Sequence, residues 1–200
     1  MKKKIVFLVA LISSLLFINT ASKAQLTNGP LFGANFANFS GDDAKDNSMR
    51  ISFHIGYEVN IPATDNISIH PQLLFSSKGA KFDDGTDKIP YNLNYIEVPI
   101  WGRYNLENGL HFDFGPYIGF LMGVTVDGES EYQNGNATHK FKDDYKSTDV
   151  GIGFGLGYEF KTPLGIAVNY NLGLSNIADY EGGDLKNSLI KISLSYTLGK

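Results

Sequence analysis

Residues Val150 to Phe160 read V-G-I-G-F-G-L-G-Y-E-F, and this stretch decides the fold. Every second residue is apolar or aromatic, and the residues between them are glycines and Glu159. Strict alternation over so many residues is the period of a β-strand. A strand that faces water normally carries charge on its second face. An apolar face opposite a face of small residues is typical of a narrow membrane-spanning β-barrel, which turns its apolar face to lipid.

Similar alternation recurs along the chain, and no helical periodicity competes with it after the N-terminal segment. Pro71 interrupts one of these segments and cannot donate a ladder hydrogen bond, so we expect a bulge there. A strand of about 11 residues, tilted by about 40°, rises roughly 28 Å, close to the thickness of the hydrocarbon layer. The predicted strands are Leu31–Phe39, Met49–Ile61, Ile67–Ser77, Asn94–Tyr104, Leu110–Val124, Val150–Phe160, Leu164–Leu174 and Ser188–Leu198.

The connections between these strands alternate in length, as they do in outer-membrane barrels with short periplasmic turns and long outer loops. The sequence therefore predicts an all-β fold, an eight-stranded antiparallel up-and-down transmembrane β-barrel with both termini on the periplasmic side. The long connections are Ser40–Ser48, Lys78–Pro90, Thr125–Ser147 and Ser175–Asn187, and the short ones are Pro62–Asn66, Asn105–Gly109 and Lys161–Pro163.

The first residues have the pattern of a secretory signal peptide. Three lysines precede the apolar run Ile5 to Ile18, and Ser22-Lys23-Ala24 offers small residues at the cleavage position. We expect cleavage between Ala24 and Gln25, which makes residues 1–24 the signal and 25–200 the barrel domain. A single membrane-anchoring helix is the alternative, but the run is short for a span. The absence of Cys excludes a lipoprotein anchor and a disulfide framework.

A soluble, lipocalin-like barrel would show the same alternation with its apolar face inward. Its water-facing surface should be rich in Lys and Glu, whereas the polar face here is mostly Gly, Asn and Ser. Aromatic residues near the strand ends favour a girdle at the membrane interface, and with it an outer-membrane location in contact with lipid. The expected girdle residues are Tyr57, Tyr104, Tyr158, Phe160, Tyr170 and Tyr196.

Several segments resemble the PorT-like outer-membrane β-barrel family of Gram-negative-type bacteria. The most specific is Y-I-E-V-P-I-W-G-R-Y at Tyr95–Tyr104. The rest of the resemblance lies in Gly33–Gly41, Gly115–Gly123, Asn169–Ile177 and the glycine-alternating stretch Val150–Phe160. The chain ends in Y-T-L-G-K, which departs from the terminal aromatic common in outer-membrane proteins. The resemblance implies an integral outer-membrane barrel, and some members of that family are tied to protein secretion across the membrane.

The sequence predicts no catalytic residue, no cofactor and no metal site. The histidines His54, His70 and His111 are single residues on three strands, without the paired spacing of metal ligands. The acidic loop Thr125–Ser147 lacks the spacing of a calcium loop. An outer-membrane enzyme could use only His139 as a base in an outer loop, with Ser130 or Ser147 as nucleophile, and nothing constrains their spacing.

Charged and polar residues on the lumenal faces form the candidate site. When each hairpin is folded about its short turn, Glu58 comes opposite His70, and Arg103 comes across from His111 and diagonal to Asp113. Because charges in a narrow, partly dry space must be paired, Arg103 is expected to anchor a plug that closes the barrel, with Glu58, Asp113 and Glu159 as its partners. The alternative is that water fills this end and solvates each charge separately. The predicted polar network comprises Glu58, His70, Arg103, His111, Asp113 and Glu159.

These features predict a non-enzymatic, monomeric outer-membrane barrel whose long loops bind a protein or serve a secretion-accessory or structural role. The net charge of −4 excludes a strongly basic nucleic-acid binder. A small pore or transport protein is the alternative, although eight strands leave an interior that side chains can just fill.

Overall fold

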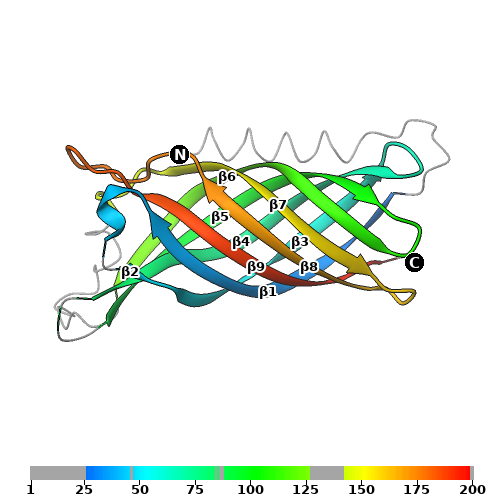
Figure 1. Cartoon of the computed structure of the whole chain (residues 1–200), viewed down its shortest axis with the longest axis horizontal. Coiled ribbons are helices and arrows are strands. Elements are labelled where there is room, and N and C mark those ends of the chain that lie inside the picture. The colour runs from blue at the N-terminus through cyan, green and yellow to red at the C-terminus, as the bar shows by residue number, and fades with distance from the viewer. Residues whose placement is uncertain (1–25, 46, 84, 86–87, 127–141, 199–200) are drawn as a thin grey trace.

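The computed structural model of the chain describes residues 26–45, 47–83, 85, 88–126 and 142–198. Eight strands form a closed antiparallel barrel, with β1 hydrogen-bonded to both β3 and β9 and with β4 paired to β5 (Figure 1). This arrangement confirms the predicted fold. The strands are β1 (Thr27–Ser40), β3 (Arg50–Pro62), β4 (Ile67–Asp83), β5 (Lys88–Asn105), β6 (Leu110–Val126), β7 (Thr148–Glu159), β8 (Leu164–Gly173) and β9 (Lys186–Tyr196), and a short strand β2 (Asn47–Ser48) pairs with β4.

The hairpin of β4 and β5 extends further than the sequence predicted. Residues 78–90 were expected to form a loop, but β4 continues to Asp83 and β5 begins at Lys88. The two strands pair without interruption from Ser77 opposite Asn94 to Asp83 opposite Lys88. Lys78, which was assigned to that loop, therefore lies on a strand, with its side chain buried in the lumen.

The irregular position in the ladder lies at Met122 and not at Pro71. Pro71 faces Ile100, and the register of β4 against β5 is the same on both sides of it, so the bulge predicted there is absent. In β6, Leu121 and Gly123 face consecutive residues of β5, which leaves Met122 as an extra residue. A bulge of this kind shifts the alternation by one residue.

The outer face of the barrel is apolar. Phe154, in the middle of β7, is 54% exposed, and Ile51 on β3 is 68% exposed. Of the expected girdle, Tyr57, Tyr104, Tyr158, Phe160 and Tyr196 are exposed near the ends of strands that border the short turns, whereas Tyr170 is half-buried and lies toward the other end of β8. Among the described residues no helix is long and apolar enough to cross a membrane.

The glycines of β7 leave room for large side chains inside the barrel. A Cβ atom added to Gly153 would lie 2.5 Å from the Trp101 ring, which is closer than real Cβ contacts approach. Gly151 lies against Tyr117 in the same way, and Gly157 against His111. The alternation of glycine that identified this strand is therefore also what lets aromatic rings fill the lumen.

Candidate functional site in the barrel lumen

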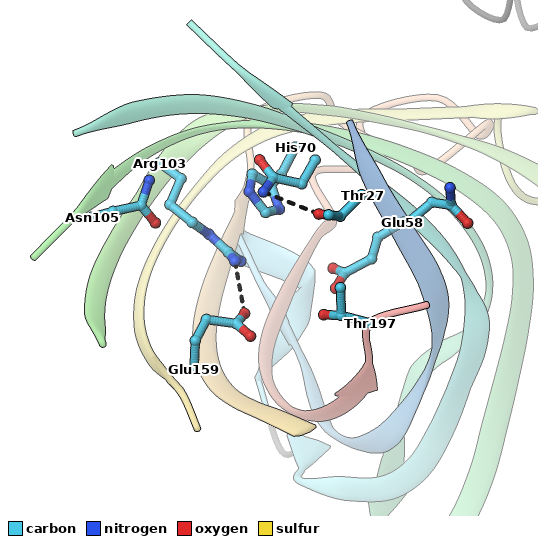
Figure 2. Close-up of a pocket in the computed structure, with 9 residues that line it drawn as sticks. Thr27, Glu58, His70, Arg103, Asn105, Glu159 and Thr197 are labelled. Carbon is cyan, nitrogen blue, oxygen red and sulfur yellow. Dashed lines mark hydrogen bonds and ion pairs between the residues drawn. The ribbon is translucent and has the colours of Figure 1, made fainter. Parts of the chain in front are cut away.

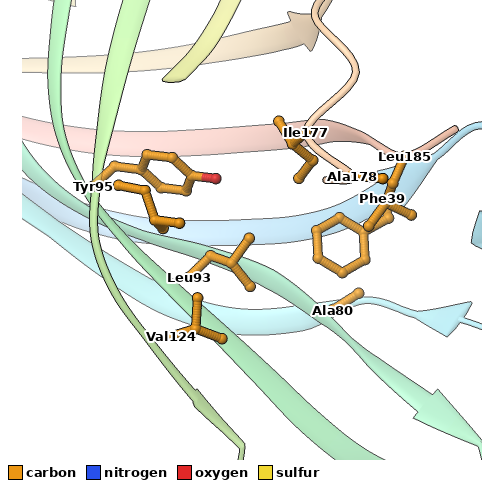
Figure 3. Close-up of a cluster of buried hydrophobic side chains, with 9 residues drawn as sticks. Phe39, Ala80, Leu93, Tyr95, Val124, Ile177, Ala178 and Leu185 are labelled. Atoms are coloured by element: carbon orange, nitrogen blue, oxygen red, sulfur yellow. The ribbon is translucent and has the colours of Figure 1, made fainter. Parts of the chain in front are cut away.

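An apolar cluster fills the mouth of the barrel at the end with the long connections, which we call the outer mouth. Ile177 and Ala178, in the connection between β8 and β9, are 0% and 2% exposed and point inward among side chains of β1, β4, β5 and β6 (Figure 3). This connection therefore folds into the mouth and covers it. The buried members of the cluster are Phe39, Ala80, Leu93, Tyr95, Leu121, Val124, Ile177, Ala178 and Leu185.

Hydrogen bonds hold this cover, the segment Leu174–Leu185, in place. Asn176 accepts from the backbone amides of Ala178 and Leu185, each at 3.0 Å, and so fixes the turn from inside. The carbonyl of Ile177 accepts from Lys146 N at 2.8 Å. On the other side, the Asp43 carboxylate accepts from Asp184 N at 3.0 Å.

Directly beneath the cover lie four buried charges, which we call the outer tetrad: Lys78, Glu97, Asp149 and Lys191. Lys78 Nζ lies 2.5 Å from Glu97 Oε2 and 2.8 Å from Asp149 Oδ2. Lys191 Nζ donates to Glu97 Oε1. None of the four is more than 2% exposed. Two ammonium groups thus face two carboxylates, which makes the tetrad neutral.

Neighbouring polar groups complete the tetrad. Asn187 Nδ2 donates to Asp149 Oδ2 at 3.0 Å, and the Lys78 ammonium lies 4.4 Å from the centre of the Tyr117 ring. A cation over an aromatic face gains electrostatic energy without needing water. The tetrad therefore keeps its charges compensated inside the barrel, where unpaired buried charges would be costly.

A second cluster, the inner cluster, lies toward the short-turn end and is built on Arg103. The guanidinium group donates two hydrogen bonds to Asp113, from Nε to Oδ1 at 2.7 Å and from Nη2 to Oδ2 at 3.1 Å. Its Nη1 donates to Glu159 Oε1 at 3.1 Å (Figure 2). Such a fork fixes both partners in geometry as well as in charge.

The structure brings the predicted network residues into one region but changes two of the expected pairings. Arg103 lies directly opposite Asp113, while His111 lies opposite Asn105. Glu58 faces Gln72, which donates to it at 3.1 Å, rather than His70. Both differences are two residues along a strand, so the side chains keep the predicted face. They arise because register depends on turn geometry, which alternation does not specify.

Two predicted network members have no hydrogen-bond partner among the described residues. Neither ring nitrogen of His70 or of His111 makes a hydrogen bond, although His111 Nε2 lies 3.6 Å from Asp113 Oδ2. The third lumenal histidine, His54, contacts Asn35 Oδ1 at 2.8 Å and Ser193 Oγ at 2.9 Å. Within the described part of the chain no group of acidic or histidine residues has the geometry of a metal site.

The outer tetrad was missed by the sequence reasoning. None of its four residues belongs to the predicted polar network, and Lys191 is buried against Glu97. Some expectations lie outside the described residues: the cleavage position Ala24–Gln25, and the part of the third loop that contains Ser130 and His139. Ser147 is described and is exposed.

Comparison with known proteins agrees with this architecture. The family model described as outer membrane protein beta-barrel domain matches residues 21–179, so the chain belongs to this family and resides in the outer membrane. Neisserial surface protein A is similar in structure, with a TM-score of 0.57 at 9% identity over 86% of this chain and 99% of that chain.

Ail, the attachment invasion locus protein of Yersinia pestis, is also similar in structure. In its complex with the heparin analogue sucrose octasulfate, its TM-score is 0.53 at 13% identity over 88% of this chain and 100% of that chain. At such identities the similarity concerns the fold alone. A comparison with curated protein sequences found no match.

Proposed function

We propose that this outer-membrane barrel is closed to ions and acts by binding at its outer loops, without enzymatic activity. The observation that carries the proposal is the filled outer mouth: Ile177 is completely buried there, and the outer tetrad beneath it is paired and buried. An ion would have to displace both layers and strip the tetrad of its partners, at a large electrostatic cost.

Planar-bilayer conductance of the refolded protein tests the closure. The parent protein should give no steady current. A variant with residues 175–185 replaced by a short Gly-Ser linker should show transient currents more often than the parent. A steady ion current through the parent protein would contradict the proposal and favour the small pore.

The composition of the outer rim indicates the kind of partner. Its described acidic residues outnumber its lysines, and the exposed Tyr180 donates to Asp43 at 3.0 Å. A basic protein surface is therefore a better match than a sulfated sugar of the kind bound to Ail in its complex. The described rim residues are Asp42, Asp43, Asp83, Asp143, Asp144, Asp179, Glu181 and Asp184, with Lys45, Lys81, Lys88, Lys142, Lys146 and Lys186.

A secretion-accessory role is the finer form of this proposal, supported by the sequence resemblance to PorT-like barrels. In that role a monomeric barrel would dock a partner through its long loops. Cross-linking in cells should then capture one defined partner, and removal of residues 128–143 should abolish that cross-link while leaving heat-modifiable gel migration unchanged. Capture that survives the deletion would assign binding to another surface.

A further inference from the structure

A polar cavity opens at the end of the barrel that carries the short turns. Its volume is about 210 Å³, far more than the roughly 10–15 Å³ that a single water molecule needs. The arrangement of its walls is shown in Figure 2. The residues that line it are Thr27, Asn28, Glu58, Asn60, His70, Arg103, Asn105, Glu159 and Thr197.

The charges around this cavity do not balance. Two carboxylates, those of Glu58 and Glu159, line the cavity with the single guanidinium of Arg103, and Arg103 also pairs with Asp113, which lies outside the lining. Arg103 pairs with Asp113 and Glu159, and within the described chain Glu58 makes no ion pair and accepts one hydrogen bond, from neutral Gln72. The cavity therefore has excess negative charge at a half-buried carboxylate, a place where a positive partner is favourable.

The groups in the cavity wall that lack partners can accept hydrogen bonds. His70 is 3% exposed and neither of its ring nitrogens is hydrogen-bonded, and a neutral imidazole offers one of them as an acceptor. Asn60 Oδ1 is also buried without a partner, while its amide donates to Thr27. The wall therefore offers acceptors and negative charge to a ligand that supplies donors and positive charge.

We propose that this cavity binds a small organic cation with several N–H donors, namely a primary ammonium group. One N–H bond and the positive charge match the Glu58 carboxylate, and rotation of the His70 ring and the Asn60 amide, whose acceptor atoms are covered in this structure, brings acceptors to the other two N–H bonds. The ammonium enters from the periplasmic side and stops at the Arg103 fork. The proposal rests on the closed barrel proposed above, because an open pore would let such a cation pass through.

Two sources could supply such a group: a free alkyl amine or a lysine side chain of a periplasmic peptide. Isothermal titration of the refolded protein in detergent micelles at neutral pH would use n-butylammonium for the first and the blocked tripeptide Gly-Lys-Gly for the second. Tetramethylammonium is the control probe, since it has the charge but no N–H donor. We expect saturable binding of at least one primary ammonium, roughly tenfold or more tighter than tetramethylammonium.

Glu58→Gln tests the site in the protein, because it removes the charge and keeps the shape. The matched control is Glu107→Gln, which removes an exposed carboxylate from the neighbouring short turn outside the cavity. Glu58→Gln should weaken n-butylammonium or tripeptide binding by roughly tenfold, and Glu107→Gln by less than about twofold. Titration of the parent protein with the primary ammonium probes and with tetramethylammonium needs no variant. This comparison therefore tests the proposed site even if Glu58→Gln fails to fold.

Binding of the free amine, alone or together with the tripeptide, would support the site as a receptor for a small amine. Binding of the tripeptide alone would support a lysine side chain as the natural occupant. Failure of both to saturate at millimolar concentrations, equal affinity for tetramethylammonium, or unchanged affinity in Glu58→Gln would overturn the proposal. Planar-bilayer current is measured on the same preparation, so a closed barrel without ammonium binding is distinguished from an open one.

Discussion

Replacing Arg103 by Met should destabilise the folded barrel strongly. The guanidinium makes two hydrogen bonds to Asp113, whose side chain is 2% exposed, and one to Glu159, whose side chain is 26% exposed. Removing one partner of a buried ion pair typically costs about 3–5 kcal/mol, because the other charge stays buried. We assign most of this cost to Asp113, since water can reach Glu159 and reduce its penalty.

Urea titration of the refolded protein in lipid vesicles measures the effect. Lys186→Met is the matched control, because its ion pair with Asp184 is about one-third exposed and should contribute less than about 1 kcal/mol. Lys191→Met cannot serve as a mild control, since Lys191 is buried against Glu97 and its removal should cost a similar amount to that of Arg103. An Arg103→Met protein within about 1 kcal/mol of the parent would refute the reasoning.

Two further predictions test the assignment of strand faces. Phe154→Arg should cost about 2–4 kcal/mol of folding free energy, because Phe154 faces lipid near the middle of β7. Asn169→Ser, in the lumen, should cost little. Equal losses of stability in urea titration would contradict the assignment of these residues to opposite faces. Gly153→Ala should cost about 1–3 kcal/mol, since its Cβ would meet the Trp101 ring, while Gly123→Ala, with open space around it, should change stability by less than about 0.5 kcal/mol. A tolerated Gly153→Ala would mean that the lumen can repack.

The fold could be predicted because one physical rule governs every strand. Lipid on one side and a narrow lumen on the other require alternation, and the stretch Val150–Phe160 displays it without interruption. The same rule placed Arg103, Asp113 and Glu159 on the lumenal face, where the structure has them in contact. Their detailed pairing differed by two residues, because register is set by hairpin turns rather than by periodicity.

The outer tetrad could not be predicted in this way. Lys78 lies in the segment K-G-A-K, whose lysines and glycine are typical of a loop, and its strand character depends on the pairing with β5. Asp149 directly precedes the predicted strand Val150–Phe160 and was not recognised as lumenal. A charge that is buried because three other strands supply its partners leaves no local signal in the sequence.

The two charged clusters differ in net charge and in access to solvent, so we assign closure of the barrel to one and ligand binding to the other. The outer tetrad contains equal numbers of lysines and carboxylates, lies beneath an apolar cover and is fully buried, as the proposed closed mouth requires, and it has no surplus charge for a ligand. The inner cluster has one guanidinium for three carboxylates and borders a cavity, so its surplus charge remains available. Substitutions at Lys78 or Lys191 should therefore affect conductance and stability, whereas Glu58→Gln should weaken ammonium binding and leave conductance unchanged.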